Sequence, residues 1–323
     1  MKYLIRYLFL LLSFCSASVA YAAPDFADMG SLEQGFLNFV TSLSAAVSSA
    51  ISSAAVQSDV TLLWTFFALL LVIWTMYEYA FGKGTIVDLV STALLIMIVK
   101  VLMATFDPLT SGIWSAANGF ASDVQTGLLG TPDLFFAPAF ISRAFASITF
   151  SDASAVDIIG GIAAAINLAI YSVVSMILSA LAYFAVIWCF WGYSIAKLIG
   201  LLFIPFLMYE RLSWLFDGWL RFFFGFVVYA IVARLNIALT ALAIAAYFGI
   251  PVANTTLIPI SQPPLTHLSQ ILSLLAFAFI GILATLSTGS FVATIVGGSA
   301  QSSGVGRMAS RGALRLAGKM FGK

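Results

Sequence analysis

Residues 60–81 read VTLLWTFFALLLVIWTMYEYAF, an apolar run with no basic residue and one acidic residue near its end. A membrane-spanning helix needs about 20 mostly apolar residues, so this stretch predicts one span. The turn Gly82-Lys83-Gly84 follows, and a second apolar stretch over 85–106 ends at Asp107-Pro108. Together they predict a transmembrane hairpin over residues 60–106.

The composition of the whole chain agrees with a membrane environment. Of its 323 residues, 62% are hydrophobic and only 8% are charged, and the mean hydropathy is +1.08. Soluble domains carry about 25% charged residues. A chain with so few charges lacks a water-facing surface, so we expect an all-α, polytopic membrane helical bundle.

Three further apolar stretches bring the expected number of spans to about five. They lie in a predicted transmembrane core over residues 161–297, which also contains a proline-rich periplasmic loop at 250–266. The stretches cover residues 162–193, 219–248 and 267–296.

Two segments do not fit a simple span. Residues 107–160 mix apolar, acidic, glycine and proline residues, which predicts a periplasmic loop holding short helices. Residues 194–216 are apolar but short, and Pro205 interrupts them. We expect this segment either to lie at the cytoplasmic interface or to dip into the membrane and return.

The N-terminus has the pattern of a signal peptide. Lys2 and Arg6 precede an apolar run, and Ala20-Tyr21-Ala22 resembles a cleavage site. Residues 1–22 are therefore either a cleaved signal peptide or an uncleaved membrane helix. Residues 23–59 place apolar side chains at three- and four-residue steps, which predicts a periplasmic amphipathic helix on the membrane, in an oligomer or on an ordinary surface.

The distribution of charge predicts which side each segment faces. The tail 298–323 carries five basic residues and no acidic one, so the positive-inside rule makes it cytoplasmic, where anionic lipid, an ATPase or DNA could contact it. Residues 24–59 carry only acidic charges, and acids that begin with Asp107 dominate 107–160, so both belong outside. Lys197, Arg211 and Arg221 surround the short apolar segment and are expected on the cytoplasmic side.

Ionisable residues inside spans are costly and often functional. Lys100 lies near the end of the second apolar stretch, so its side chain can extend to the outer interface. Arg234 lies deeper and should face a helix interface or an aqueous cavity. The last span places Gly289, Ala293 and Gly297 at four-residue spacing, a stripe that allows close helix packing, including packing between subunits.

The sequence contains little that points to an enzyme. Its two cysteines are Cys15 and Cys189, and its single histidine is His267, so it offers no cysteine-based zinc site and no histidine cluster. Phosphate-binding loops of the Walker type and Gly-x-Ser-x-Gly elbows are also missing from the sequence. We therefore expect no catalytic residues, no metal and no cofactor.

The middle of the chain resembles a known family. Residues 196–211 read AKLIGLLFIPFLMYER, and residues 215–220 read LFDGWL. An apolar segment that ends in Pro-Phe, then a short charged stretch, then Gly-Trp-Leu at the start of a long span is similar to the TrbL/VirB6 family, the polytopic inner-membrane subunits of type IV secretion systems. The likeness extends over roughly residues 30–300.

The resemblance implies a scaffold and conduit subunit that forms a ring in the bacterial inner membrane. Such a subunit supports pilus assembly and the passage of DNA or protein, and its implied partners are pilins, bitopic scaffold subunits and the secretion ATPase. Carried over to this chain, Pro205 would end the interfacial segment and Gly218 would allow close packing. Trp219 would anchor at the interface, and Glu210 and Arg211 form the charged stretch.

A stand-alone small-molecule transporter or channel is the alternative from another class. Secondary transporters usually contain internal repeats around a binding site at the midplane of the membrane. No inverted repeat is evident in this sequence, and only Arg234 could serve such a site.

Overall fold

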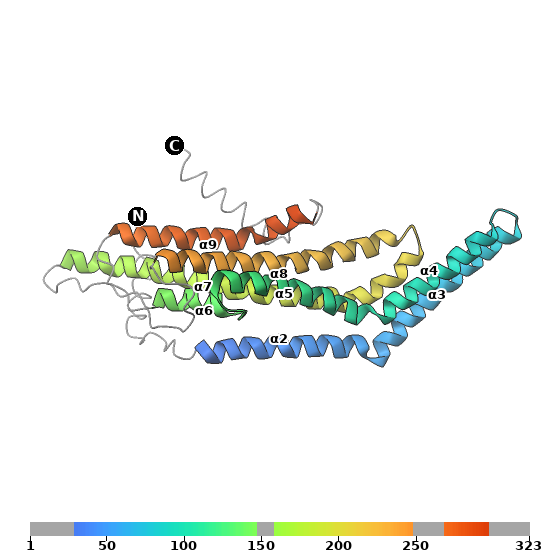
Figure 1. Ribbon diagram of the computed structural model, residues 1–323, viewed down its shortest axis with the longest axis horizontal. Coiled ribbons are helices and arrows are strands. Elements are labelled where there is room, and N and C mark those ends of the chain that lie inside the picture. The colour runs from blue at the N-terminus through green and yellow to red at the C-terminus, as the bar shows by residue number, and fades with distance from the viewer. Residues whose placement is uncertain (1–28, 147–157, 248–267, 297–323) are drawn as a thin grey trace, which may run out of the picture. The chain divides into compact units, whose positions relative to one another are not determined.

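The computed structural model describes residues 29–146, 158–247 and 268–296, and the described residues contain helices and no strand. This confirms the predicted all-α class. In chain order the elements in Figure 1 are α2 (Met29–Ser52), α3 (Ala54–Ala80), α4 (Ile86–Ala104), α5 (Phe106–Leu129), α6 (Phe136–Ala146), α7 (Ile158–Phe203), the 3-10 helix η2 (Ile204–Met208), α8 (Ser213–Tyr247) and α9 (Leu268–Ile295).

Among the described residues, six helical segments are long and apolar enough to cross a membrane by length and composition. The chain is thus a multi-pass membrane protein. One of the six, Gln34–Ser52 in α2, is not among the predicted spans, and it has the lowest mean hydropathy of the set, 1.3. The expectation that α2 stays outside the membrane therefore remains a prediction. The five predicted spans correspond to Ala54–Ala80, Ile86–Ala104, Ser172–Met208, Ser213–Tyr247 and Leu275–Ile295.

Helices α3 and α4 form the predicted hairpin. Gly82 adopts a φ of +69°, which glycine reaches without strain, and the backbone N–H groups of Lys83 and Gly84 both donate to the carbonyl of Glu78. Helix α3 starts at Ala54, earlier than predicted, because the Ser53 hydroxyl accepts from the Val56 N–H at 3.5 Å and caps the helix.

The segment after the hairpin differs from the prediction of short helices over 107–160. Helix α5 alone has 24 residues, and only α6, with 11 residues, is short. The reason lies in Asp107-Pro108, which in the sequence alone resembles a break. A proline in the first helical turn needs no hydrogen-bonded N–H, so this dipeptide starts a helix directly after α4 ends.

Helix α7 has no break near Ser194, where two apolar stretches are separated in the sequence analysis. Helix α7 continues through it to Phe203, because the first proline after Ser194 is Pro205. Pro205 disfavours the α conformation in the residue before it, so the chain tightens into η2. Whether this segment crosses the membrane stays a prediction.

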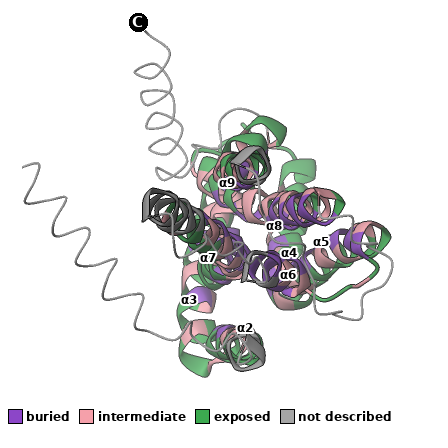
Figure 2. Ribbon diagram, turned by 90° about the vertical axis from the view of Figure 1, so that its left-hand side faces the viewer, coloured by how far each residue is buried: buried purple, intermediate pink, exposed green. Residues whose placement is uncertain are grey.

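The residues group into two compact units. Unit 1 takes its described residues from Met1–Phe36, Thr126–Tyr183 and Ile237–Ala284, and in it Phe36, Phe135 and Tyr183 stack with ring centroids 5.4–6.0 Å apart. Figure 2 shows by colour that individual helices carry both buried and exposed residues.

Unit 2 contains Leu37–Gln125, Phe184–Asn236 and the described part of Thr285–Lys323. Within it η2 packs against both arms of the hairpin, where Phe206 lies 5.3 Å from Phe67 between ring centroids. The outer face of α3 is apolar and exposed, as expected of a helix in contact with lipid: Leu62, Phe66, Ile73 and Trp74 are each more than half exposed.

Gly200 is a point of close helix approach in unit 2, and it yields a prediction. A Cβ at Gly200 would lie 2.5 Å from Trp219 Cζ2 and 2.6 Å from Phe106 Cζ, whereas a Cβ at Gly218 would meet nothing within 4 Å. Gly200→Leu should therefore lower the free energy of unfolding by about 1–3 kcal/mol through overpacking.

Gly218→Leu is the matched control, since both glycines are helical and the same side chain is added. It should leave stability in mild detergent unchanged when thermal unfolding is measured. Equal losses for the two variants would mean that helix packing at Gly200 is not tight.

Candidate functional site

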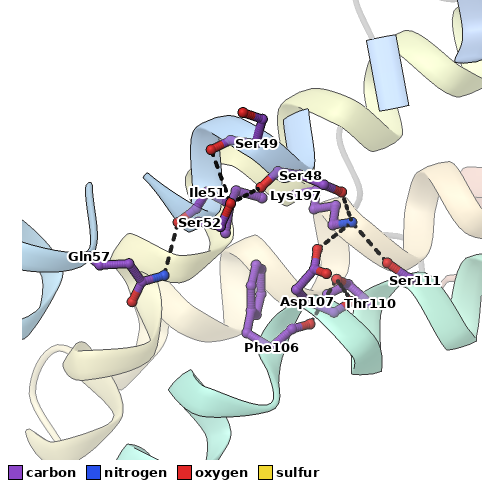
Figure 3. A network of polar contacts seen from close by, with 10 residues as sticks. All are labelled: Ser48, Ser49, Ile51, Ser52, Gln57, Phe106, Asp107, Thr110, Ser111 and Lys197. Carbon is purple, nitrogen blue, oxygen red and sulfur yellow. Dashed lines mark hydrogen bonds and ion pairs between the residues drawn. The ribbon is translucent and has the colours of Figure 1, made fainter. Parts of the chain in front are cut away.

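Lys197 lies at the centre of a buried polar cluster in unit 2. Its side chain is 4% exposed, and its Nζ lies 2.6 Å from Asp107 Oδ1. The same ammonium donates to Ser111 Oγ at 2.9 Å and to Ser48 Oγ at 3.2 Å. Figure 3 shows the three acceptors converging on the lysine from α2 and α5.

The start of α5 explains how these groups meet. Asp107 lies in the first turn of α5, where a carboxylate interacts favourably with the helix dipole. Ser111 follows at four-residue spacing and therefore shares its face of the helix. One turn further on, Trp114 stacks on Tyr193 of α7 with centroids 4.2 Å apart, which fixes α5 against α7.

The cluster satisfies a charge in an apolar setting. An ammonium group has three donor positions, and three oxygens surround this one. Removing water from a charge costs several kcal/mol, so the arrangement holds only while the acceptors stay in place. The Asp107 side chain is 48% exposed, so this carboxylate keeps partial access to its surroundings.

The ion pair corrects the charge-based topology. The charge pattern predicts Lys197 on the cytoplasmic side and Asp107 on the outer side, yet their charged atoms are 2.6 Å apart. Both residues therefore lie at one level, and at least one of the two assignments is wrong. The prediction fails because it treats Lys197 as a surface charge, although the side chain points inward and Asp107 neutralises its charge.

Trp219 is an interior residue rather than an interfacial anchor. It is 6% exposed, and its indole N–H donates to the carbonyl of Ala196 at 2.8 Å, so it ties α8 to α7. Its ring also packs on Phe106 and Phe223, with centroids 5.7 Å apart in each case. The expected anchoring role at the membrane surface is thus replaced by a packing role.

The other residues of the motif surround the bend between α7 and α8. Pro205 is buried in η2, whereas Glu210, Arg211 and Gly218 are exposed. Close packing within one copy of the chain therefore does not involve Gly218. Gly200, which the motif also contains, takes that role.

Arg234 faces a helix interface, one of the two environments expected for it. It is 7% exposed, and its Nε donates to Oε1 of the fully buried Gln125 at 2.5 Å. A weaker contact joins Nη1 to the carbonyl of Asn118 at 3.5 Å. The neighbouring Asn236 donates to Thr288 of α9 at 3.0 Å, whereas these contacts of Arg234 are with α5.

The remaining candidates lie apart from these clusters. The Lys100 ammonium is 4.6 Å from the ring centroid of Trp64, a cation–π contact on the exposed side of α4. On α9 the buried positions include Thr285, Thr288 and Val292, while Gly289 and Ala293 are half-buried. Gly297 lies outside the described residues, so the packing role of this stripe stays a prediction.

A family model for the TrbL/VirB6 plasmid conjugal transfer protein matches residues 68–288, well over half of the chain. The chain belongs to the TrbL/VirB6 family. It is therefore a component of a conjugal transfer, type IV secretion system. No curated protein matches the chain.

The boundaries of the TrbL/VirB6 match divide the candidate site. Lys197, Asp107 and Ser111 lie inside the matched region, together with the bend and Arg234. Helix α2, which supplies Ser48, precedes it. The TrbL/VirB6 region thus supplies the ion pair, and the segment before it adds the third acceptor.

Sequence reasoning missed the Lys197 cluster and the role of Gln125. A usable signal existed for Lys197, because it is a single cation inside an apolar stretch with no acid nearby in sequence. Nothing comparable marks Gln125, Ser48 or Ser111, since uncharged polar residues are common in membrane helices.

The two members of the ion pair should differ in the cost of their removal. Asp107→Ala leaves a buried ammonium with only two hydroxyl partners, which should lower the free energy of unfolding by about 3–5 kcal/mol. Lys197→Met keeps the volume and leaves a half-exposed carboxylate that water can reach, so its cost should be smaller. Thermal unfolding of both variants in detergent measures the difference.

The double variant Asp107→Ala/Lys197→Met provides the control. It should be no less stable than Lys197→Met, since the pair couples the two sites. Two results together would contradict a buried ion pair. The stability losses of the single variants would add up in the double variant, and Asp107→Ala would lose no more stability than Lys197→Met.

Proposed function

We propose that this protein is an inner-membrane scaffold and conduit subunit of a type IV secretion system, which supports pilus assembly and the passage of substrate across the inner membrane. The match to the TrbL/VirB6 family over residues 68–288 carries this proposal. The match extends from the hairpin through α9, so it includes most of the helices that are apolar enough to span the membrane.

The buried contacts fit a structural role rather than an enzymatic one. The charged side chains of Lys197 and Arg234 are bound between helices, in the ion pair with Asp107 and in the contact with Gln125. Groups held in this way fix helix positions. We accordingly propose that the protein acts as a scaffold without catalytic residues, metal or cofactor.

The proposed oligomeric state, orientation and partners follow from the proposed role as a scaffold and conduit. The subunit would form a homo-oligomeric ring, with a periplasmic N-terminus after processing and a cytoplasmic C-terminus. Its partners would be pilins, bitopic scaffold subunits and the secretion ATPase, and translocated DNA or protein would pass transiently. The basic tail, which favours the cytoplasmic side by the positive-inside rule, lies outside the described residues.

Deletion of the gene in its natural host should abolish conjugal transfer and pilus formation, and the wild-type gene supplied in trans should restore both. Transfer frequency and surface pili are the measurements. Gly218→Leu should complement the deletion fully, which controls for expression of a variant chain. Normal transfer without the protein would contradict the proposal.

Native complexes extracted in mild detergent provide a second test. Cryo-electron microscopy should reveal a ring that carries other secretion subunits. A stable monomer or dimer without partners, enclosing a cavity at Arg234, would instead favour a transporter.

A further inference from the structure

Within unit 2, helix α5 runs beside α8 over a length close to the thickness of a membrane. Phe106 packs on Trp219, and further along both helices Gln125 accepts from Arg234. Between Phe106 and Gln125 the helix rises by about 28 Å, close to the roughly 30 Å hydrocarbon core of a bilayer. Helix α8 is long and apolar enough to span the membrane, whereas α5 is not. A spanning α8 therefore carries a less apolar helix at membrane depth.

The exposed face of α5 lacks the character of a surface that contacts lipid. Leu109 and Phe120 are its only large apolar side chains in unit 2, whereas the exposed face of α3 consists mainly of such side chains. A Cβ added at Gly112 or Gly119 would meet nothing within 4 Å, so the space in front of these glycines is open. The other exposed residues are small or polar, and they are Pro108, Gly112, Ser115, Ala116, Gly119 and Asp123.

Asp123 places a carboxylate on this face near the middle of the membrane. It lies in α5 between Asn118 and Gln125, which both contact Arg234, so it is at the level of that guanidinium. Arg234 is the only charged residue in the apolar run 222–247 of α8 and lies near its middle. A charge at this depth is costly in lipid.

Water is the environment that fits this carboxylate. Within the described part of the chain, Asp123 is exposed and has no hydrogen-bond or ion-pair partner. Acyl chains would leave its charge uncompensated, and a closely packed second copy would also remove it from water. Water solvates the carboxylate and fills the open space in front of the glycines.

We propose that the exposed face of α5 lines a water-filled space at membrane depth, where Asp123 attracts cations. The inference rests on the proposed conduit role and identifies one wall of the conduit. In the proposed ring every copy contributes one such carboxylate, and acidic rings of this kind make an aqueous path attractive to cations.

The reactivity of an introduced cysteine tests whether water reaches this face. Gly119→Cys adds a thiol in open space. Membrane vesicles open to both sides, from cells that make the whole secretion system, are treated with a cationic or an anionic methanethiosulfonate. These charged reagents modify thiols that are in contact with water. Gly119→Cys should react at least about tenfold faster than the wild-type protein, whose cysteines are Cys15 and Cys189.

Two control positions separate water from protein and from lipid. Ala121→Cys places the thiol on the buried face of the same helix, and Leu69→Cys places it on the exposed apolar face of α3. Both should react as slowly as the wild-type protein in membranes. Both should react fully after unfolding in sodium dodecyl sulfate, which shows that the thiols are present.

The charge of the reagent tests the role of Asp123. Gly119 and Asp123 are four residues apart, so their side chains are neighbours on the helix. With each rate divided by the rate for a free thiol in solution, Gly119→Cys should react about tenfold faster with the cationic reagent than with the anionic one. Adding Asp123→Asn should bring the two normalised rates to within about twofold of each other.

Equally slow reaction of Gly119→Cys and Ala121→Cys in membranes would overturn the proposal, because lipid, a second copy or another segment would then cover the face. A rate ratio that Asp123→Asn leaves unchanged would overturn the attraction of cations. The deletion test judges the conduit role separately. Fast labelling of Gly119→Cys, together with normal transfer in the deletion strain, would contradict the conduit and leave the water-facing surface of α5 in place.

Discussion

The structure depends on keeping one ammonium group neutralised away from water. Lys197 is buried in α7, and α5 and α2 hold their positions because they bring Asp107, Ser111 and Ser48 to it. In apolar surroundings no water takes the place of a polar partner that moves away, so the ammonium constrains all three helices together. The packing of Trp114 on Tyr193 belongs to the same interface between α5 and α7.

The bend between α7 and α8 is the second organising feature. Proline and the 3-10 turn end α7, and the indole of Trp219 then ties the start of α8 back to the carbonyl of Ala196. That carbonyl belongs to the residue before Lys197. The family motif and the buried ion pair are therefore parts of one structural unit, although they look unrelated in the sequence.

Hydropathy was sufficient to predict the helical class and the hairpin, because every backbone group of a span is paired within its own helix. It failed where tertiary contacts decide. Asp107-Pro108 resembles a break and is a helix start, and Lys197 resembles a cytoplasmic surface charge and is buried. Trp219 resembles an interfacial anchor in the sequence, but its contacts with other helices bury it. Pairing partners far apart in the chain, such as Gln125 and Arg234, leave no periodic signal in a single sequence.

The order of synthesis gives the ion pair a further meaning. Ser48 precedes Lys197 by 149 residues, and Ser111 precedes it by 86. At a synthesis rate of about 5–20 residues per second, the start of α5 waits roughly 4–17 seconds before its cationic partner is made. During that interval the nascent hairpin and α5 carry an unneutralised carboxylate. A chain truncated before α7 never acquires the cation that neutralises this carboxylate in the folded protein.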